Sequence, residues 1–313
     1  MDGDLKAGQL VAAIDVGGTS IKTALVAEDL RVVHTHRTAT RRVAGSVDVD
    51  QIAELIEELR SAAGTATVCG VGVAAPGIID ERQGVARAAV NLGWRELPLR
   101  ALLSEAAGMP VALGHDVRTG GLAEFTVGAA TGVRNAMFMP IGTGIAAAVL
   151  VDDHRLDADG YAGEIGHIVV DPQGTVCGCG TRGCLETVAS AMHIARRYAE
   201  ITGRPVIRAA DVADAVRAGD PDAVAVWGRA VEGLAAALTT ACTLFAPEIV
   251  AIGGGLAESG DTLLAPLREA LVGRLTFQRV PKLVPASLGD NAGCIGSAIM
   301  AWQAVSGRAE GPA

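Results

Sequence analysis

The segment LVAAIDVGGTSIKTALV (Leu10–Val26) contains two apolar runs separated by a pair of glycines. The first run, Leu10–Val16, has the nearly continuous apolar character of a buried strand. Gly17 and Gly18 then permit a tight turn, after which the second run reverses the chain direction. The segment therefore predicts a strand, a turn and a second strand, with Asp15 close to the end of the first strand.

The second half of the chain contains the same pattern. Two apolar runs, Ala136–Pro140 and Ile145–Val151, flank Gly142-Thr143-Gly144 and predict another hairpin around a glycine turn. Further strands are predicted near residues 31–38, 68–74, 111–113 and 249–252, and helices near 48–63, 99–107, 187–198, 209–218, 223–244 and 295–305. Since no linker separates the halves, we expect two similar α/β lobes with a cleft between them and a shared hinge.

Composition excludes several classes of protein. Half of the 313 residues are apolar, which is typical of a folded chain large enough for two lobes. The net charge of −9 argues against nucleic acid as the main partner. Apolar runs are interrupted by glycine, proline or polar residues before they could span a membrane. The first ten residues include Asp2, Asp4 and Lys6 and lack the apolar centre of a signal peptide, so we expect a cytoplasmic protein.

A group of metal-binding residue types lies in EIGHIVVDPQGTVCGCGTRGCLE (Glu164–Glu186). His167, Cys177, Cys179 and Cys184 occur within eighteen residues and form a Cys₃His set, which is a complete tetrahedral ligand set for structural zinc. The glycines between them allow the backbone to fold tightly. A disulfide is a weaker interpretation because two of the cysteines are too close to pair easily and the cytoplasm is reducing.

Two carboxylates flank this group of ligands, Glu164 on one side and Glu186 on the other. A structural zinc does not require them. We therefore interpret the segment as one that holds His167 between two carboxylates and presents all three to a ligand.

The glycine turns are candidates for anion binding. Backbone N–H groups at Gly17 and Gly18 can approach an anion closely, and Thr19 adds a hydroxyl. Asp15 could hold Mg²⁺ through water. An ordinary hairpin turn is the alternative, but the Asp at the strand end and the second turn at 142–144 favour a functional one. Neither turn is followed by the GK[ST] of a P-loop.

Eight short features occur in the order found in the ROK family of repressors, open reading frames and sugar kinases. They are DVGGTSIK (15–22), APG (75–77), NLGW (91–94), an Asp before a helix at Asp116, GTGI (142–145), GEIGH (163–167), CGCGTRGCLE (177–186) and GGG (253–255). The resemblance extends over residues 10–305, and the zinc segment is its most specific part. It implies a two-lobed actin-like ATPase (ribonuclease H-like) fold with a structural zinc loop, in which ATP and sugar meet in the cleft.

The resemblance also implies residue roles. Asp116 resembles the catalytic base. Glu164, His167 and Glu186 resemble ligands of sugar hydroxyls, with His167 using one nitrogen for zinc and the other for sugar, and Asn91 resembles a further position of the sugar-binding lobe. The implied nucleotide contacts, with Asp15 serving Mg²⁺, are Gly17, Gly18, Thr19, Gly142, Thr143, Gly144 and Gly254.

Two positions depart from the family pattern. His115 stands where the family usually has an Asn that binds a sugar hydroxyl. An imidazole can also donate and accept, but with different reach and charge, so the substrate is affected more than the reaction. Packing alone is the alternative for His115. Ala146-Ala147 replaces glycine after the second turn, which costs little only where φ is negative.

The favoured function is ATP- and Mg²⁺-dependent phosphorylation of a hexose, with glucose 6-phosphate as the expected product. The alternatives are an N-acetylmannosamine or N-acetylglucosamine kinase, polyphosphate as the donor, and a catalytically weak sugar-sensing regulator. We expect no DNA-binding domain because the phosphate motif begins at Asp15, whereas ROK repressors carry an N-terminal helix-turn-helix.

The expected domains are an N-terminal lobe at 9–115, completed by a C-terminal helix at 296–313, and a C-terminal lobe at 116–295 that holds the zinc site. The resemblance also suggests a homodimer or homotetramer.

Overall fold

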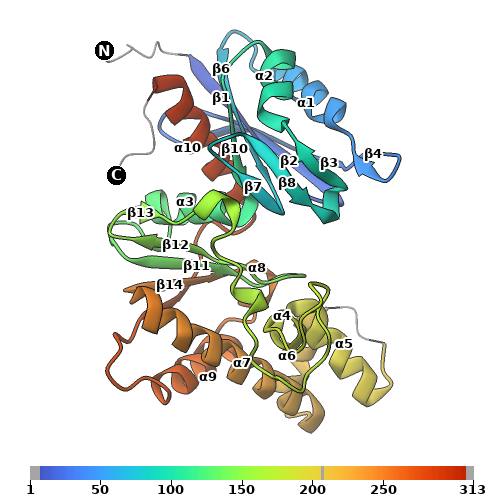
Figure 1. Cartoon of the computed structure of the whole chain (residues 1–313), viewed down its shortest axis with the longest axis vertical. Coiled ribbons are helices and arrows are strands. Elements are labelled where there is room, and N and C mark those ends of the chain that lie inside the picture. Colours follow the sequence, from blue (N-terminus) through green and yellow to red (C-terminus); the bar gives the residue numbers. More distant parts are fainter. Residues whose placement is uncertain (1–7, 206–207, 308–313) are drawn as a thin grey trace. The chain divides into compact units, whose positions relative to one another are not determined.

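The computed structural model describes residues 8–205 and 208–307, which form two compact units (Figure 1). Unit 1 contains the described residues through Ala123, together with Asp157–Ala162 and residues 290–307. Unit 2 contains Glu124–Leu156 and Gly163–Gly289, apart from the two residues that are not described. Residues 1–7, which were used to argue against a signal peptide, lie outside the described residues. Residues 308–313, the end of the helix predicted at 296–313, also lie outside them.

The sheet of unit 1 has the strand order β10-β6-β1-β2-β3. Its strands are β1 (Gln9–Val16), β2 (Ser20–Val26), β3 (Val32–Ala39), β6 (Thr67–Ala75) and β10 (Val111–His115). The predicted hairpin is confirmed, since β1 and β2 are antiparallel with Val16 opposite Ile21. Strands β6 and β10 run parallel to β1, so all three end at the same edge of the sheet.

Helices cover both faces of this sheet. Successive side chains of the buried strands point to opposite faces, so both faces carry apolar side chains that must be covered. Ala12 and Ile14 pack with residues of α1 (Val49–Ala62) and α2 (Leu99–Ala107). Val11 and Ala13 pack with α10 (Ala292–Ser306) on the other face. Here α10 lies so close that a Cβ at Gly72 would be 1.8 Å from the Ser297 carbonyl oxygen. Helix α3 (Asp116–Val127) follows β10 without a loop residue between them.

Unit 1 also contains short strands that the sequence did not predict. They are β4 (Arg42–Val43), β5 (Ser46–Val47), β7 (Ile78–Asp80), β8 (Val85–Ala89) and β9 (Trp94–Leu97), accompanied by the 3-10 helices η1 (Val90–Leu92) and η2 (Ala158–Gly160). The 3-10 helix η4 (Gly289–Asn291) begins at the last residue of unit 2 and continues into unit 1. Strands β7, β8 and β9 form a separate antiparallel sheet. Strands of two to five residues are too short for an apolar period to be recognised.

The sheet of unit 2 has the order β13-β12-β11-β14-β15. Its strands are β11 (Ala136–Pro140), β12 (Ala148–Val151), β13 (His154–Arg155), β14 (Ile249–Gly253) and β15 (Lys282–Pro285). As in unit 1, an antiparallel hairpin pairs with a parallel strand, here β14 beside β11. The expectation of two similar α/β units is thereby confirmed.

The helices of unit 2 are α4 (Glu186–Ala189), α5 (Ala191–Thr202), α6 (Ala209–Arg217), α7 (Pro221–Phe245), α8 (Gly254–Ala257) and α9 (Asp261–Val272), with the 3-10 helix η3 (Ile165–His167). The prediction of one helix near 187–198 was wrong. Ser190 is extended, with ψ of 151°, and its hydroxyl accepts a hydrogen bond from the His193 N–H, so it ends α4 and caps α5. Helix α9 and strand β15 were not predicted. Among the described residues, no helix has both the length and the apolar character needed to cross a membrane.

Candidate functional site

The first glycine turn, Gly17-Gly18-Thr19, is held both by its own backbone and by Thr40. The Gly17 N–H donates to the Ser20 carbonyl (3.0 Å), and a Cβ at Gly17 would lie 2.7 Å from that oxygen. The Thr40 hydroxyl donates to the Gly17 carbonyl (2.8 Å), and the Thr40 N–H donates to the Thr19 carbonyl (3.0 Å). The turn is thus fixed from two sides, while Thr19 itself is exposed.

Asp15, next to this turn, is a carboxylate with incomplete charge compensation. The Lys22 ammonium lies 4.0 Å from it but is closer to Asp290, at 3.2 Å. Burial, followed by the nearby Asp116 carboxylate, raises the pKa of Asp15 to about 6. A cation such as Mg²⁺ would relieve both effects, so the environment fits the predicted role of Asp15.

Asp116 is the first residue of α3, at the same sheet edge as Asp15. Strands β1 and β10 both flank β6, and Asp15 and Gly114 are paired with the same residue, Ala74. The side chain of Asp116 is 35% exposed and therefore accessible to a ligand. Topology thus brings together in unit 1 two carboxylates that are about a hundred residues apart in the sequence.

His115 is buried, with 6% of its surface exposed. Its Nδ1 lies 3.4 Å from the Arg118 backbone nitrogen, and its Nε2 lies 3.3 Å from Oδ1 of Asp116. Both ring nitrogens therefore have protein partners, one of which is the predicted base itself.

Asn91 lies in η1 and is exposed. Its carbonyl accepts a hydrogen bond from Nη2 of Arg42 (2.6 Å), and the same nitrogen donates to the Gly18 carbonyl (3.1 Å). Arg42 therefore connects the NLGW segment to the first glycine turn. Sequence reasoning missed this arginine because nothing local distinguishes it from a solvated surface residue.

The second glycine turn, Gly142-Thr143-Gly144, joins β11 to β12. Ile141 and Ile145 form a β-bridge at its base, and the Gly142 N–H donates to the Gly144 carbonyl (3.0 Å). Thr143 and Gly144 are exposed. Neither Ala146 nor Ala147 has a positive φ, so the methyl groups that replace glycine here cause no backbone strain.

Gly254 lies directly against the base of the second turn. Its φ is +73°, and a Cβ on it would be 2.5 Å from the Ile141 carbonyl oxygen. The Ile141 carbonyl accepts a hydrogen bond from the Leu256 N–H (3.1 Å), and the Ile141 N–H donates one to the Gly253 carbonyl (2.9 Å). The GGG segment and the second turn, both predicted to contact nucleotide, therefore lie side by side in unit 2.

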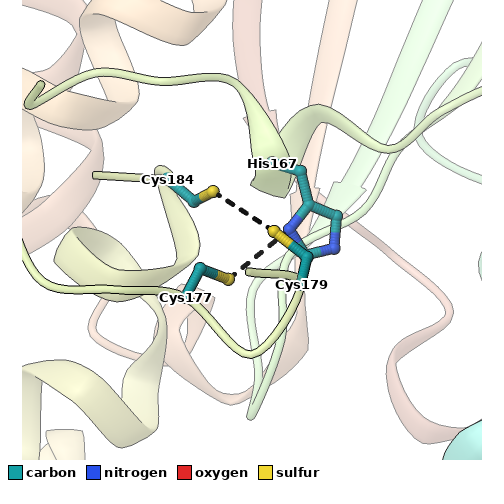
Figure 2. A group of neighbouring side chains, drawn as sticks. All are labelled: His167, Cys177, Cys179 and Cys184. Atoms are coloured by element: carbon teal, nitrogen blue, oxygen red, sulfur yellow. Dashed lines mark hydrogen bonds between the residues drawn. The ribbon is translucent and has the colours of Figure 1, made fainter. Parts of the chain in front are cut away.

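The predicted zinc ligands converge in unit 2 (Figure 2). The ligand atoms of His167, Cys177, Cys179 and Cys184 all lie within 4.8 Å of one another. The separation is 3.7 Å between the Cys179 and Cys184 sulfurs and 3.7 Å between the Cys177 sulfur and Nδ1 of His167. A tetrahedral zinc with Zn–S bonds of about 2.3 Å has edges of about 3.8 Å, so these four residues fit the ion.

Glycines make the tight fold of this loop possible. Gly183 has φ of +79° and approaches the Asp171 backbone so closely that a Cβ would be 1.7 Å from its carbonyl oxygen. Gly180 has φ of +92° and closes a turn onto the Cys177 carbonyl. Val169 and Cys184 form a β-bridge that joins the two ends of the loop. The loop thus brings together ligands from both of its ends.

The thiols of the cluster differ in acidity. Hydrogen bonds from Thr181 lower the pKa of Cys179 to about 6, whereas burial raises the pKa of Cys184 to about 12. A metal that binds here would displace the proton from Cys184, as thiolate ligation requires.

The three predicted sugar ligands are arranged around this loop. His167 directs Nδ1 toward the cysteines, and its Nε2 lies 3.8 Å from the carboxylate of the exposed Glu164. Oε2 of Glu186 accepts a hydrogen bond from the Ile145 N–H (3.1 Å). Glu186 is thereby anchored to the second glycine turn, whereas Glu164 and His167 form a separate pair.

Comparison with known proteins agrees with this architecture. Glucokinase of Thermotoga maritima is 35% identical over 312 residues, which cover 94% of this chain and 98% of the relative. N-acetylmannosamine kinase of Citrobacter koseri is 32% identical over 297 residues, with coverage of 92% and 97%. The structure of a ROK family glucokinase from Streptomyces griseus in complex with glucose and AMPPNP superposes with a TM-score of 0.79 at 28% identity, covering 94% of this chain and 99% of that one.

Two α/β units, each built on a hairpin with a glycine turn, define the actin-like ATPase fold, and the predicted fold class is confirmed. The chain belongs to the ROK family, whose family model matches residues 11–304. Its enzymatic class is that of the ATP-dependent sugar kinases.

Proposed function

We propose that this sugar kinase transfers the γ-phosphoryl group of Mg²⁺-bound ATP to the 6-hydroxyl of glucose, with Asp116 as the general base. The observation that carries the proposal is the position of Asp116 in unit 1, at the same sheet edge as Asp15 and the first glycine turn. The same name, glucokinase, belongs to the Thermotoga relative and to the glucose-bound Streptomyces enzyme.

In the proposed reaction Asp116 accepts the proton of the sugar hydroxyl as that oxygen attacks the γ-phosphorus. A new O–P bond forms, the bond to the bridging oxygen of ADP breaks, and ADP leaves. Phosphoryl transfer depends mainly on positioning and on neutralisation of charge, which the glycine turns and a magnesium ion near Asp15 would supply. A positioned base adds about 10²–10⁴-fold.

Sugar hydroxyls would be bound by Glu164, His167 and Glu186, with Asn91 as a further contact. Zinc on Nδ1 of His167 would fix the orientation of the ring, leaving Nε2 for the sugar. The zinc would then have a structural role and would affect activity by orienting His167, which binds the sugar.

The N-acetylmannosamine kinase relative supports a second candidate substrate class, the N-acetylated hexosamines. The test is a coupled ADP-release assay over glucose, mannose, N-acetylmannosamine and N-acetylglucosamine, repeated with polyphosphate as the donor. We expect the highest kcat/KM for glucose with ATP. Preference for an N-acetylated sugar would replace the substrate assignment, and absence of turnover with every sugar would contradict the kinase assignment.

Asp116→Asn tests the base directly. We expect kcat to fall about 10²–10⁴-fold, because a positioned base contributes that much, while calorimetry still detects glucose binding. A variant that turns over near the wild-type rate would show that another group accepts the proton.

A further inference from the structure

A buried ion pair between Arg118 and Glu81 lies at the junction between β10 and α3, next in sequence to the predicted base. The side chain of Arg118 is 1% exposed and that of Glu81 is 8% exposed. Nε of Arg118 donates to Oε1 of Glu81 at 2.8 Å. Burying two charges is costly, and such a pair is retained only where its hydrogen bonds are well satisfied.

The other guanidinium nitrogens of Arg118 are bonded to backbone carbonyls. Nη2 donates to Ile79 (3.0 Å), and Nη1 donates to Gly160 (3.2 Å) and Ala162 (3.4 Å). Gly160 is pressed against β7, because a Cβ on it would be 2.5 Å from the Ile79 carbonyl oxygen. One arginine thus joins α3, β7 and the segment 157–162 in a single arrangement.

This network is connected to the junction between β10 and α3. Oε1 of Glu81, which accepts from Arg118, also accepts from the backbone N–H of His115 (3.2 Å). The backbone N–H of Arg118 in turn points to Nδ1 of His115 (3.4 Å). Because Nδ1 is an acceptor, the neutral ring carries its proton on Nε2, and this nitrogen lies 3.3 Å from Oδ1 of Asp116.

Oδ1 of Asp116 is also bonded to the backbone N–H of Val117 (2.7 Å). Since the His115 and Val117 contacts both fall on Oδ1, we assign proton acceptance to Oδ2. The Val117 hydrogen bond and the adjacent Nε2 of His115 together restrict the rotation of the carboxylate, which is the property that a general base needs for a short, aligned approach to a hydroxyl.

We propose that Glu81, Arg118 and His115 form a positioning network that presents Oδ2 of Asp116 to the sugar hydroxyl, so that His115 orients the base and does not bind the sugar. The inference rests on the proposed function. The family pattern implied that His115 binds a sugar hydroxyl, whereas the partners of its two ring nitrogens indicate that it positions Asp116.

The first experiment compares His115→Gln with His115→Phe. The amide nitrogen of Gln can occupy the place of Nε2 and present an N–H to Asp116, whereas Phe fills the space without a donor. We expect His115→Phe to lower kcat about 10–100-fold with KM for glucose changed less than about two-fold, and His115→Gln to retain most of kcat. Increased KM for glucose with unchanged kcat in His115→Phe would overturn the proposal in favour of sugar binding.

The second experiment compares Arg118→Lys with a matched control, Arg87→Lys. Arg87 pairs at 2.9 Å with Asp80, the residue before Glu81, and its other side-chain partners are Gln83 and Glu96. In both variants lysine keeps the positive charge but lacks the planar set of N–H donors of the guanidinium group. We expect about a ten-fold or larger loss of kcat only for Arg118→Lys, with the sugar KM retained. Equal effects on kcat in the two variants would overturn the proposal.

Nitrogen-15 NMR of the His115 ring provides a readout that does not require turnover, and His115→Gln identifies its signals. We expect the Nε2–H tautomer in the wild type and a redistribution of tautomers in Arg118→Lys. An Nδ1–H tautomer in an active wild type would overturn the positioning network while leaving the kinase assignment intact. Conversely, an inactive wild type with the Nε2–H tautomer would contradict the proposed function and support the geometry of the network.

Discussion

Oε2 of Glu186 lies 3.1 Å from the backbone nitrogen of Ile145 and accepts its hydrogen bond. A carboxylate predicted to bind sugar is therefore attached to the turn predicted to bind phosphate. A Cβ at residue 144 would be 2.7 Å from the same oxygen, so any larger residue there would force the Glu186 carboxylate to shift. One hydrogen bond in unit 2 therefore connects the residue predicted to bind sugar to the turn predicted to bind phosphate.

Removal of this hydrogen bond should affect both substrates. We expect Glu186→Ala to raise KM for ATP as well as for glucose, since the N–H of the buried Ile145 loses its half-buried acceptor at a cost of about 1–3 kcal/mol. Glu164→Ala is the matched control, because Glu164 is paired with His167 and not with the turn, and it should raise KM for glucose alone. The measurement is initial-rate kinetics with each substrate varied. An unchanged KM for ATP in Glu186→Ala would show that the turn keeps its conformation without the carboxylate.

Asp15→Asn should abolish activity and yet stabilise the protein at neutral pH. The pKa of Asp15 is raised in the folded state to about 6 from an ordinary value of 3.8, chiefly by burial. Its favourable contribution is thus complete below about pH 4 and is lost as pH rises through 6, above which the ionised group destabilises the fold. At pH 8 without Mg²⁺, Asn should raise the free energy of unfolding by roughly 1–3 kcal/mol.

Thermal unfolding of Asp15→Asn and wild type at pH 4 and pH 8 provides the measurement. The difference between the two proteins should be small at pH 4 and should favour the variant at pH 8. A variant less stable than the wild type at pH 8 would contradict the expected sign.

Loss of one zinc ligand should release the metal and weaken the fold of its loop. Elemental analysis of the purified protein should give one zinc per chain, and Cys184→Ser should reduce this content and lower Tm and sugar affinity together. Cys242→Ser is the control, because Cys242 is also buried but belongs to α7 and to no ligand group among the described residues. A metal-free wild type that remains folded and active would exclude a zinc requirement.

Gly254→Ala should be destabilising, in contrast to Gly255→Ala. Gly254 has φ of +73° and no room for a Cβ against the Ile141 carbonyl, whereas Gly255 has open space and no positive φ. We expect a cost of about 1–3 kcal/mol at position 254 and little change at position 255. Urea denaturation measures the stability, and nucleotide affinity should fall only for Gly254→Ala. Equal stabilities of the two variants would show that the contact between Gly254 and the second turn relaxes freely.

The sequence alone determined the features that depend on near neighbours. The helix Leu99–Ala107 was predicted with correct bounds, since Gly108 ends it in the left-handed conformation that glycine adopts readily. The two hairpins follow from apolar runs on either side of glycine turns. The His/Cys cluster could be predicted because all four residues lie in one loop, where spacing along the chain limits their distance in space.

Tertiary structure decided what depends on residues far apart in the chain. Glu81 and Arg118 are separated by strands and a helix, and no local pattern distinguishes them from solvated charges, yet folding buries both and joins them to His115. The break at Ser190 was also hidden, because apolar spacing continues across it while the hydroxyl caps the following helix. Only packing against non-local partners determines which polar groups lose water, and those groups are the ones that orient Asp116 and hold the turns.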